Sequence, residues 1–427
     1  MASLPDDCNS NTTTVDVKNI INTVALLPED ITILIVNKLD LVGFHRFSAV
    51  CRSWQSIAIA AKKIRQQFLP QPQLPWLMLS SSSSSESESE SESESEHGFF
   101  SLLHGKVFKL ELPPEVYGAR CCGSNWGWLI MVDIEGCNFL LNPFTKVQIE
   151  LPPQATIPAL GQGFIYESVQ KSPNYIRKAM LMLSPPPAAA ATNNVVLSSL
   201  VNTDDCLVVA IYCSYNLAFC RPGDRAWTAI TNENLPLRTS FEDFIFYNGK
   251  LYSINLKYDL MIVELFPHQK VTSCNIAPLP AEEEEDQNNF PTELKKSAYL
   301  VECLGELLMV IKWGVGSVSP KTVVFKIFKL DPQRLCWIKV NDLGDQILFI
   351  GTSTGFSISA LDYPGFRGNC IYFTDDYSHD IVSMVLGPTD CHDLGVFHLE
   401  DNSIEPFFSN YSHSSLSPPI WFTPVSW

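Results

Sequence analysis

The chain has 427 residues, 46% of them hydrophobic, and a formal net charge of −17 at pH 7. This length and apolar content allow a large buried core and predict two or three domains. The negative charge argues against a nucleic-acid-binding protein, because phosphate backbones are bound by clustered Lys and Arg.

Other whole-chain features concern the cellular compartment. No stretch approaches the roughly 18 consecutive apolar residues that a membrane span needs. The first residues lack the basic and apolar regions of a secretory signal. The 13 Cys include no Cys-x-x-Cys pair, so we expect reduced thiols and a location in the cytosol, the nucleus or both.

The N-terminal part divides into a polar stretch and a helical one. Residues 1–23 are small, polar and without periodicity, so we expect them to be disordered. Residues 27–30, Leu-Pro-Glu-Asp, have the features of a helix start, because Pro in the first turn loses no hydrogen bond and acidic side chains favour the positive end of the helix dipole. Apolar spacing then predicts three helices over residues 24–65.

These helices carry more apolar side chains than so short a unit can bury. Ile31, Ile35 and Leu39 recur on one helical face, and Leu34 and Val36 are apolar as well. Three helices in about forty residues bury too little surface to stand alone comfortably. We interpret the excess as an interface for another polypeptide; the alternative is packing against the rest of the same chain.

A polar segment follows the helices. Residues 66–97 contain the proline-rich sequence PQPQLPW and an alternating Ser/Glu tract, and they predict a linker. Ser87, Ser89, Ser91 and Ser93 each have a Glu three residues downstream. Acidophilic kinases prefer this pattern, so these serines are candidate phosphorylation sites; the alternative is a self-repelling, solvated spacer.

The remainder, residues 98–427, is a series of short apolar runs separated by Gly, Pro, Asn and Asp, which predicts an all-β domain. One phrase recurs, consisting of Gly, any residue and a strand. Its copies begin at residues 127, 205, 249, 305 and 368, with Asp in place of Gly at 205. Two similar phrases at 105 and 395 lie close to a neighbouring copy, so we expect them at another strand position.

Repeats of this length with several strands each are typical of β-propeller blades. The domain has room for about six or seven blades of the usual size. A pair of β-sandwiches or an irregular β domain is the alternative.

Sequence patterns of several enzyme classes are missing. The chain contains no H-E-x-x-H, no G-x-x-x-x-G-K-[ST] and no complete G-x-G-x-x-G. Cys391-His392-Asp393 could suggest metal ligands, but such a triplet is more typical of a polar loop. We therefore expect neither catalysis by this chain nor a cofactor or metal.

The sequence LPEDITILIVNKLDLVGFHRFSAVCRSW resembles an F-box. The match consists of the Leu-Pro start, the apolar ladder of the first helix and the Val-Cys-Arg-x-Trp end; Phe47 stands where Leu is more usual. The resemblance implies a surface for a Skp-type adaptor, with its supporting core, made of Leu27, Pro28, Ile31, Ile35, Leu39, Val50, Cys51 and Trp54.

The β domain resembles the C-terminal region of plant F-box proteins that is called domain of unknown function 295 and is considered a kelch-like β-propeller. PWLML, FFSLLHGKVFKL, RCCGSNWGWLIMVD and LLNPFTKVQIELPP carry the likeness, and the Gly-Gly doublet of kelch repeats is missing. The resemblance implies a chain of mixed α and β domains: a small three-helix F-box (24–65), the linker (66–97) and an all-β, kelch-like propeller (98–427).

F-box proteins connect a Skp-type adaptor, and through it a cullin, to a target protein. The resemblance therefore implies the substrate-recognition subunit of a Skp-cullin-F-box ubiquitin ligase. The F-box would bind the adaptor, the propeller would bind an unknown protein substrate, and other subunits would transfer ubiquitin. The alternative is a propeller scaffold that binds partners without a role in ubiquitin ligation.

Overall fold

The computed structural model describes residues 28–39, 41–65, 74–79, 96–158, 170, 172, 175–183, 206–213, 216–230, 240–265, 270–274, 294–316, 321–353, 355–374, 393–407 and 418–424. These residues fall into two compact units, one with the helices and one with the strands. Residues 1–23, Leu27 and the four candidate serines lie outside the described residues. None of the described helices is long and apolar enough to cross a membrane.

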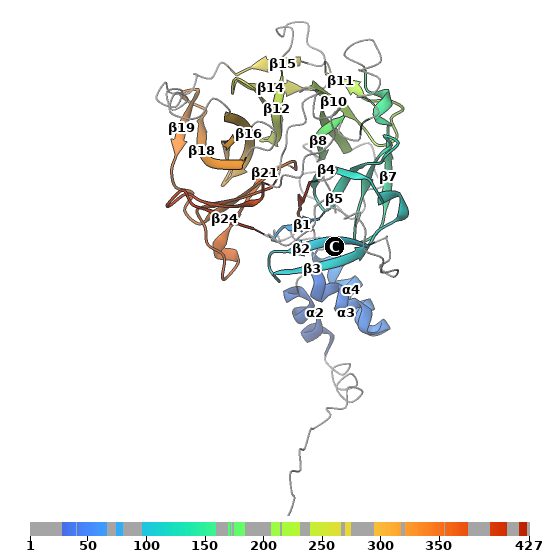
Figure 1. The fold of residues 1–427 in the computed structure, drawn as a ribbon. Coiled ribbons are helices and arrows are strands. Elements are labelled where there is room, and N and C mark those ends of the chain that lie inside the picture. Colours follow the sequence, from blue (N-terminus) through green and yellow to red (C-terminus); the bar gives the residue numbers. More distant parts are fainter. Residues whose placement is uncertain are drawn as a thin grey trace, which may run out of the picture. The chain divides into compact units, whose positions relative to one another are not determined.

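The described residues of the first unit form three helices, as predicted: α2 (Glu29–Lys38), α3 (Leu41–Val50) and α4 (Arg52–Arg65) (Figure 1). Helix α2 begins directly after Pro28, whose carbonyl accepts hydrogen bonds from the backbone N–H and the hydroxyl of Thr32 at 3.0 and 3.1 Å. The three helices share a small core made of Val36, Phe44, Phe47, Ala58 and Ala61.

The second unit is a β-propeller, with sheets arranged around an axis (Figure 1). The first sheet contains β25 (Ile420–Phe422), β1 (Trp76–Met78), β2 (Glu96–Ser101) and β3 (Lys106–Glu111), and the second β4 (Arg120–Asn125), β5 (Trp128–Val132), β6 (Asn138–Leu141) and β7 (Gln148–Leu151). The third contains β8 (Ile176–Leu183), β9 (Cys206–Tyr212), β10 (Asn216–Cys220) and β11 (Thr228–Ala229), and the fourth β12 (Phe241–Tyr247), β13 (Lys250–Asn255), β14 (Leu260–Glu264) and β15 (Lys270–Ser273).

A nine-stranded sheet combines the last two blades. The fifth blade is an antiparallel meander of β16 (Leu294–Cys303), β17 (Glu306–Val315), β18 (Lys321–Asp331) and β19 (Cys336–Val340). The sixth contains β20 (Gln346–Ile350), β21 (Gly355–Ser359), β22 (Cys370–Phe373), β23 (Gly395–His398) and β24 (Ile404–Pro406). Strand β21 pairs in parallel with the end of β16 and so joins the two. The described strands therefore form six blades, within the predicted range.

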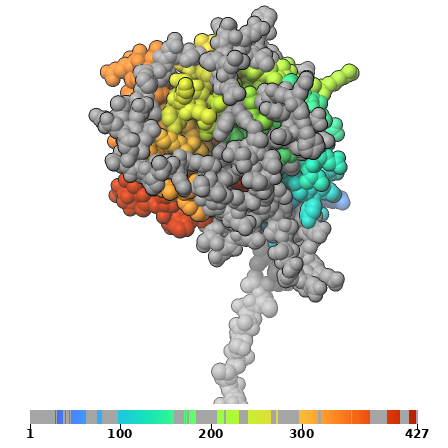
Figure 2. Space-filling view, turned by 45° about the horizontal axis from the view of Figure 1, so that its top comes forward, coloured from blue at the N-terminus to red at the C-terminus, as the bar shows by residue number. Residues whose placement is uncertain are grey.

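The two ends of the propeller sequence meet in the first blade. Strand β25 pairs with β1 through Trp76 opposite Phe422 and Met78 opposite Ile420. The indole N–H of Trp421 donates a hydrogen bond of 3.1 Å to the carbonyl of Ile350 in the sixth blade. The ring is thereby closed, which leaves no open sheet at the junction. Figure 2 shows the chain passing around this unit in order, from cyan through green and yellow to orange and red.

Apolar clusters fill the spaces between neighbouring blades, because successive strand residues point to opposite faces of a sheet. In β9 the side chains of Leu207, Val209 and Ile211 join a cluster with the fourth blade, whereas Val208 and Ala210 join one with the second blade. Both faces of β9 are buried, which explains its unbroken apolar sequence.

The recurring phrase marks the same place in four blades. The copies that begin at 127, 205, 249 and 305 form β5, β9, β13 and β17, each the second strand of its blade, and the copy at 368 forms β22. The phrase at 105 forms β3, the fourth strand of the first blade, and the phrase at 395 forms β23. The expectation that these two lie at other strand positions is therefore met.

The propeller begins earlier than the sequence suggests. Strand β1 lies inside the range 66–97 that was predicted to be a linker, and it pairs on one side with β2 and on the other with β25. All three β1 residues are buried. The long polar insertion between β1 and β2 hides this strand in the sequence, because it separates three apolar residues from the rest of their sheet.

Three short 3-10 helices connect strands in the described part of the propeller. They are η1 (Pro114–Val116), η2 (Gln154–Thr156) and η6 (Ala360–Asp362).

Candidate functional site

The helical unit presents large apolar side chains to solvent. Ile31, Leu34 and Ile35 lie three and four residues apart on α2, so they share one side of the helix. Leu34 is 61% exposed and Ile35 is 42% exposed, whereas the neighbouring Val36 is fully buried in the core of the unit. Val50 and Ile59 add exposed apolar surface on α3 and α4. We call these five residues the helical apolar surface.

The residues predicted to bind an adaptor separate into two groups. Pro28, Ile31, Ile35 and Val50 are exposed, and Leu39, Cys51 and Trp54 are half-buried. Trp54 stacks on Phe47 with ring centroids 4.2 Å apart, so it supports the unit from within. Leu27 lies outside the described residues. Leu34 and Ile59 were not among the predicted residues; the exposure that distinguishes them from Val36 depends on how the three helices pack.

A second candidate site lies on the propeller, where the inner strands β4, β12 and β16 end in two-residue hairpin turns. Their central residues are Trp126-Gly127, Asn248-Gly249 and Leu304-Gly305, and all six have positive φ values. These turns have the type I′ geometry, in which Asn-Gly is the favoured sequence. Trp126 and Leu304 depart from this preference.

Beside these turns lies a cavity of about 460 Å³, which we call the axial cavity. It is bordered by the ends of β4, β8, β12 and β16 and by the start of β21, so five blades contribute to it. Its apolar lining includes Trp126, Met182, Phe246, Leu304 and Phe356. Among the described residues that line it, Glu302 has the only charged side chain.

The other two polar side chains that line the cavity, those of Asn125 and Ser357, are already hydrogen-bonded within the fold. Asn125 donates to the carbonyl of Leu181 at 2.5 Å and accepts from its N–H at 3.0 Å. Ser357 donates to the backbone carbonyl of Glu302 at 2.9 Å. The exposed carboxylate of Glu302 is therefore the charged group that the axial cavity offers to a ligand.

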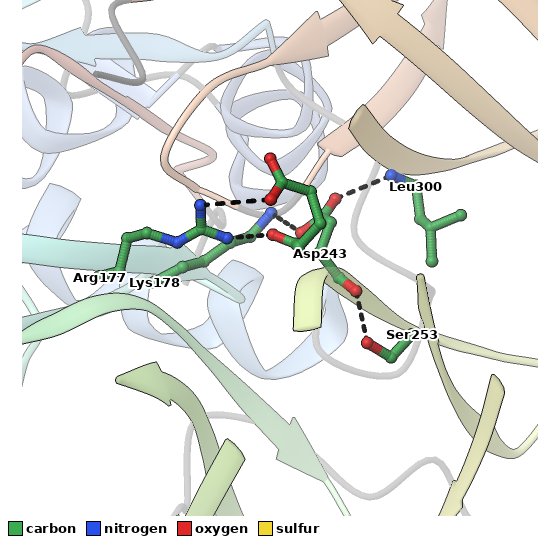
Figure 3. A network of polar contacts seen from close by, with 6 residues as sticks. Arg177, Lys178, Asp243, Ser253 and Leu300 are labelled. Carbon is green, nitrogen blue, oxygen red and sulfur yellow. Dashed lines mark hydrogen bonds and ion pairs between the residues drawn. The ribbon is translucent and has the colours of Figure 1, made fainter. Parts of the chain in front are cut away.

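A buried polar network joins β8, β12 and β16 (Figure 3). Lys178 lies 2.5 Å from one carboxylate oxygen of Asp243, and the N–H of Leu300 donates to the other at 2.8 Å. The hydroxyl of Ser253 donates to the carbonyl of Asp243 at 2.7 Å, and Arg177 donates to the carbonyl of Glu242. Burial raises the pKa of the Glu242 carboxyl. Only a small space of about 30 Å³ adjoins these groups, so we interpret the network as holding blades together.

The propeller sequence also contains one enzyme-type pattern. Residues 351–355, Gly-Thr-Ser-Thr-Gly, match the G-x-S-x-G of hydrolase nucleophile elbows. Such an elbow needs an exposed Ser between a strand and a helix. Here Ser353 is almost completely buried and lies between two strands, β20 and β21. The pattern therefore does not form a nucleophile elbow.

In the part of the chain that the structure describes, no three His, Cys, Asp or Glu side chains are grouped so that they could hold a metal ion. Cys391 and His392 lie outside that part.

Two models of known protein families match parts of this chain. The family model of the KIB1-4 beta-propeller matches residues 99–398, and that of the F-box domain matches residues 25–61. Two similar proteins from Arabidopsis thaliana are the putative F-box protein At3g25750, 25% identical over 88% of this chain and 92% of that protein, and the F-box protein KIB4, 23% identical over 94% of each.

Solved structures are more distant. A protein of unknown function from Bacteroides thetaiotaomicron is similar with a TM-score of 0.31 and 9% identity, over 65% of this chain and 58% of that one.

Proposed function

Because this chain belongs to the KIB1-4 β-propeller family and carries an F-box domain, we propose that it is the substrate-recognition subunit of a Skp-cullin-F-box ubiquitin ligase. In this role the helical unit binds a Skp-type adaptor, and through it a cullin, while the propeller holds a protein substrate. The chain itself performs no catalysis and acts in the cytosol, the nucleus or both. We also propose that its propeller is the diverged kelch-like domain of unknown function 295.

The observation that carries the proposal is the helical apolar surface. Ile31, Leu34 and Ile35 are exposed together on α2, although the unit has a core of its own that buries Val36. Burying a large apolar side chain is worth about 1.5–3 kcal/mol. Three such side chains left in water are therefore costly to the unit alone and favour association with a second polypeptide.

Affinity capture with a purified Skp-type adaptor tests this role. The full chain should retain the adaptor, and the double substitution Ile31→Glu and Ile35→Glu should abolish retention, because it places two carboxylates in the apolar contact. Ile134→Glu serves as the matched control, since Ile134 is an exposed Ile of the propeller. Failure of the unsubstituted chain to retain the adaptor contradicts the proposal.

A second measurement separates a ligase subunit from a scaffold. Proteins that co-purify with the propeller should become more abundant in cells that express a chain lacking residues 24–63, because they are no longer delivered to the ligase. If adaptor binding is observed but partner abundance never changes, the non-degradative scaffold is the better description.

A further inference from the structure

Two large apolar residues occupy an unfavourable backbone conformation at the rim of the axial cavity. Trp126 and Leu304 have φ values of 54° and 52°, in the left-handed region. For a residue with a Cβ this conformation costs roughly 1–2 kcal/mol, and Asn tolerates it better than other such residues. The equivalent turn of the fourth blade has Asn248, with φ 47°.

Burial does not offset this cost. Leu304 is 76% exposed and Trp126 is 46% exposed, so neither side chain gains the stabilisation of a core position. Strained residues that the fold does not need are a reason to look for a binding role. Both residues line the same cavity, together with Met182, Phe246 and Phe356.

The cavity also has a definite charge preference. Its apolar lining holds one exposed carboxylate, that of Glu302, and no described Lys or Arg. A ligand that fills the cavity with apolar atoms would therefore be favoured when it places a positive charge beside Glu302. A volume of about 460 Å³ accommodates one or two large side chains.

We propose that the axial cavity binds a short segment of a protein partner in which a large apolar side chain stands next to a Lys or Arg. The apolar side chain packs against Trp126 and Leu304, and the cation pairs with Glu302. This inference rests on the receptor role proposed above, because it names the surface of the propeller that holds the target.

A protein segment suits the site better than a small molecule does. Small-molecule sites enclose most of the ligand surface, whereas Leu304 and Trp126 stand at the tips of hairpins and remain exposed. Aromatic and apolar residues that project from a surface beside a pocket are typical anchors of protein interfaces.

Selection from a displayed library of random 12-residue peptides tests the proposal. The full chain, immobilised without the adaptor, should enrich peptides in which Lys or Arg adjoins Leu, Met, Phe or Trp. Glu302→Lys should change the enriched charge from basic to acidic, because the group that faces the cation is reversed. Glu150→Lys, at an exposed Glu on the outer strand β7, should leave the enriched pattern unchanged.

A second variant tests the role of the strained turn. Leu304→Asn should weaken the best enriched peptide about tenfold or more, as loss of an anchor does, and should raise Tm by about 2 °C because Asn suits the left-handed turn. Leu335→Asn is the control: Leu335 is an exposed Leu with φ 51° in the turn between β18 and β19, outside the cavity. It should also raise Tm but leave peptide affinity unchanged.

Three outcomes overturn the inference. They are enrichment of no peptide, enrichment of acidic peptides by the unsubstituted chain, and equal binding of the enriched peptide to the unsubstituted chain, Glu302→Lys and Leu304→Asn. Adaptor capture is measured on the same samples. If the adaptor is retained but no peptide is selected, the proposed binding by the cavity is wrong and the ligase role is not contradicted. If peptides are selected but the adaptor is not retained, the ligase role is wrong and the proposed binding by the cavity is not contradicted.

Discussion

Lys178 and Asp243 face each other across the boundary between the third and fourth blades, with Nζ 2.5 Å from Oδ1 and both side chains almost completely buried. The second oxygen of Asp243 accepts from the N–H of Leu300 in the fifth blade. One carboxylate therefore connects three consecutive blades near the axis (Figure 3). A buried charge of this kind is tolerated only because its partners are in place.

Substitution of Asp243 should destabilise the propeller strongly. Asp243→Ala leaves the Lys178 ammonium and the Leu300 N–H buried without their acceptor, and we expect a loss of about 3–5 kcal/mol in the free energy of unfolding. Urea denaturation followed by tryptophan fluorescence measures it. Glu111→Ala, which removes an exposed pair with Lys146, should change the same quantity by less than about 1 kcal/mol. Equal effects of the two substitutions would contradict the role assigned to the network.

The neighbouring Glu242 should make stability depend on pH. Its pKa is raised above the ordinary 4.5, chiefly by burial, so the folded protein holds a proton that the unfolded chain releases. The contribution of the Glu242 carboxyl to the free energy of unfolding is full below pH 4.5, and it is lost as pH rises through the folded-state pKa. Glu242→Gln cannot lose that proton, so its Tm relative to the unsubstituted protein should increase from pH 4 to pH 8. A difference that stays constant or shrinks over that range would show that Arg177 stabilises the ionised carboxylate more than burial opposes it.

Closure of the ring should depend on the indole of Trp421. This side chain packs against Phe349 with ring centroids 5.1 Å apart and donates to the carbonyl of Ile350. Trp421→Ala removes a buried aromatic side chain, which costs about 3–5 kcal/mol. We expect limited proteolysis to cleave the variant first near β1 and β25, since these strands would lose their connection to the sixth blade. Tyr117→Ala, at an exposed aromatic residue, should leave the cleavage pattern unchanged.

The inner strands of the second and third blades approach so closely that only Gly fits at residue 123. A Cβ built there would lie 1.9 Å from the carbonyl oxygen of Ala179. Gly123→Ala must therefore separate β4 from β8, and we expect a loss of about 1–3 kcal/mol or more. Gly223→Asn is the comparison, because Gly223 has φ +89° but open space around it, and Asn tolerates that region. Thermal unfolding should show a clear decrease of Tm for Gly123→Ala and a small decrease for Gly223→Asn.

The repeating order of the fold could be predicted from the sequence, and its closure could not. The Gly-led phrases carry local information, because Gly127, Gly249 and Gly305 are required by the hairpin turns that precede β5, β13 and β17. The pairing of Trp76 with Phe422 carries no such local signal: both strands have three residues, and one follows a proline-rich connector. The predicted start of the propeller was therefore placed after β1.

The two candidate sites also differ in how far they could be predicted from the sequence. The three helices of the helical unit could be predicted, because helix periodicity and the F-box pattern are local features of the sequence. Which of its apolar residues face solvent could not be predicted, since Leu34 and Val36 are equally apolar in sequence. The axial cavity could not be predicted at all, because Trp126, Glu302 and Phe356 come from three different blades and meet only when the ring closes.

The contrast between Ile35 and Val36 gives the sharpest test of the helical apolar surface. Ile35→Ala removes an exposed side chain, so Tm should not change, but binding of a purified Skp-type adaptor should weaken by roughly 1–3 kcal/mol. Val36→Ala creates a cavity in a small core and should lower Tm, with weaker adaptor binding only to the extent that the unit unfolds. Calorimetric titration at a temperature well below both Tm values separates the two effects. If Ile35→Ala binds the adaptor as tightly as the unsubstituted chain, and Leu34→Ala does as well, then α2 does not contact the adaptor through this face, and its exposed apolar residues serve another partner.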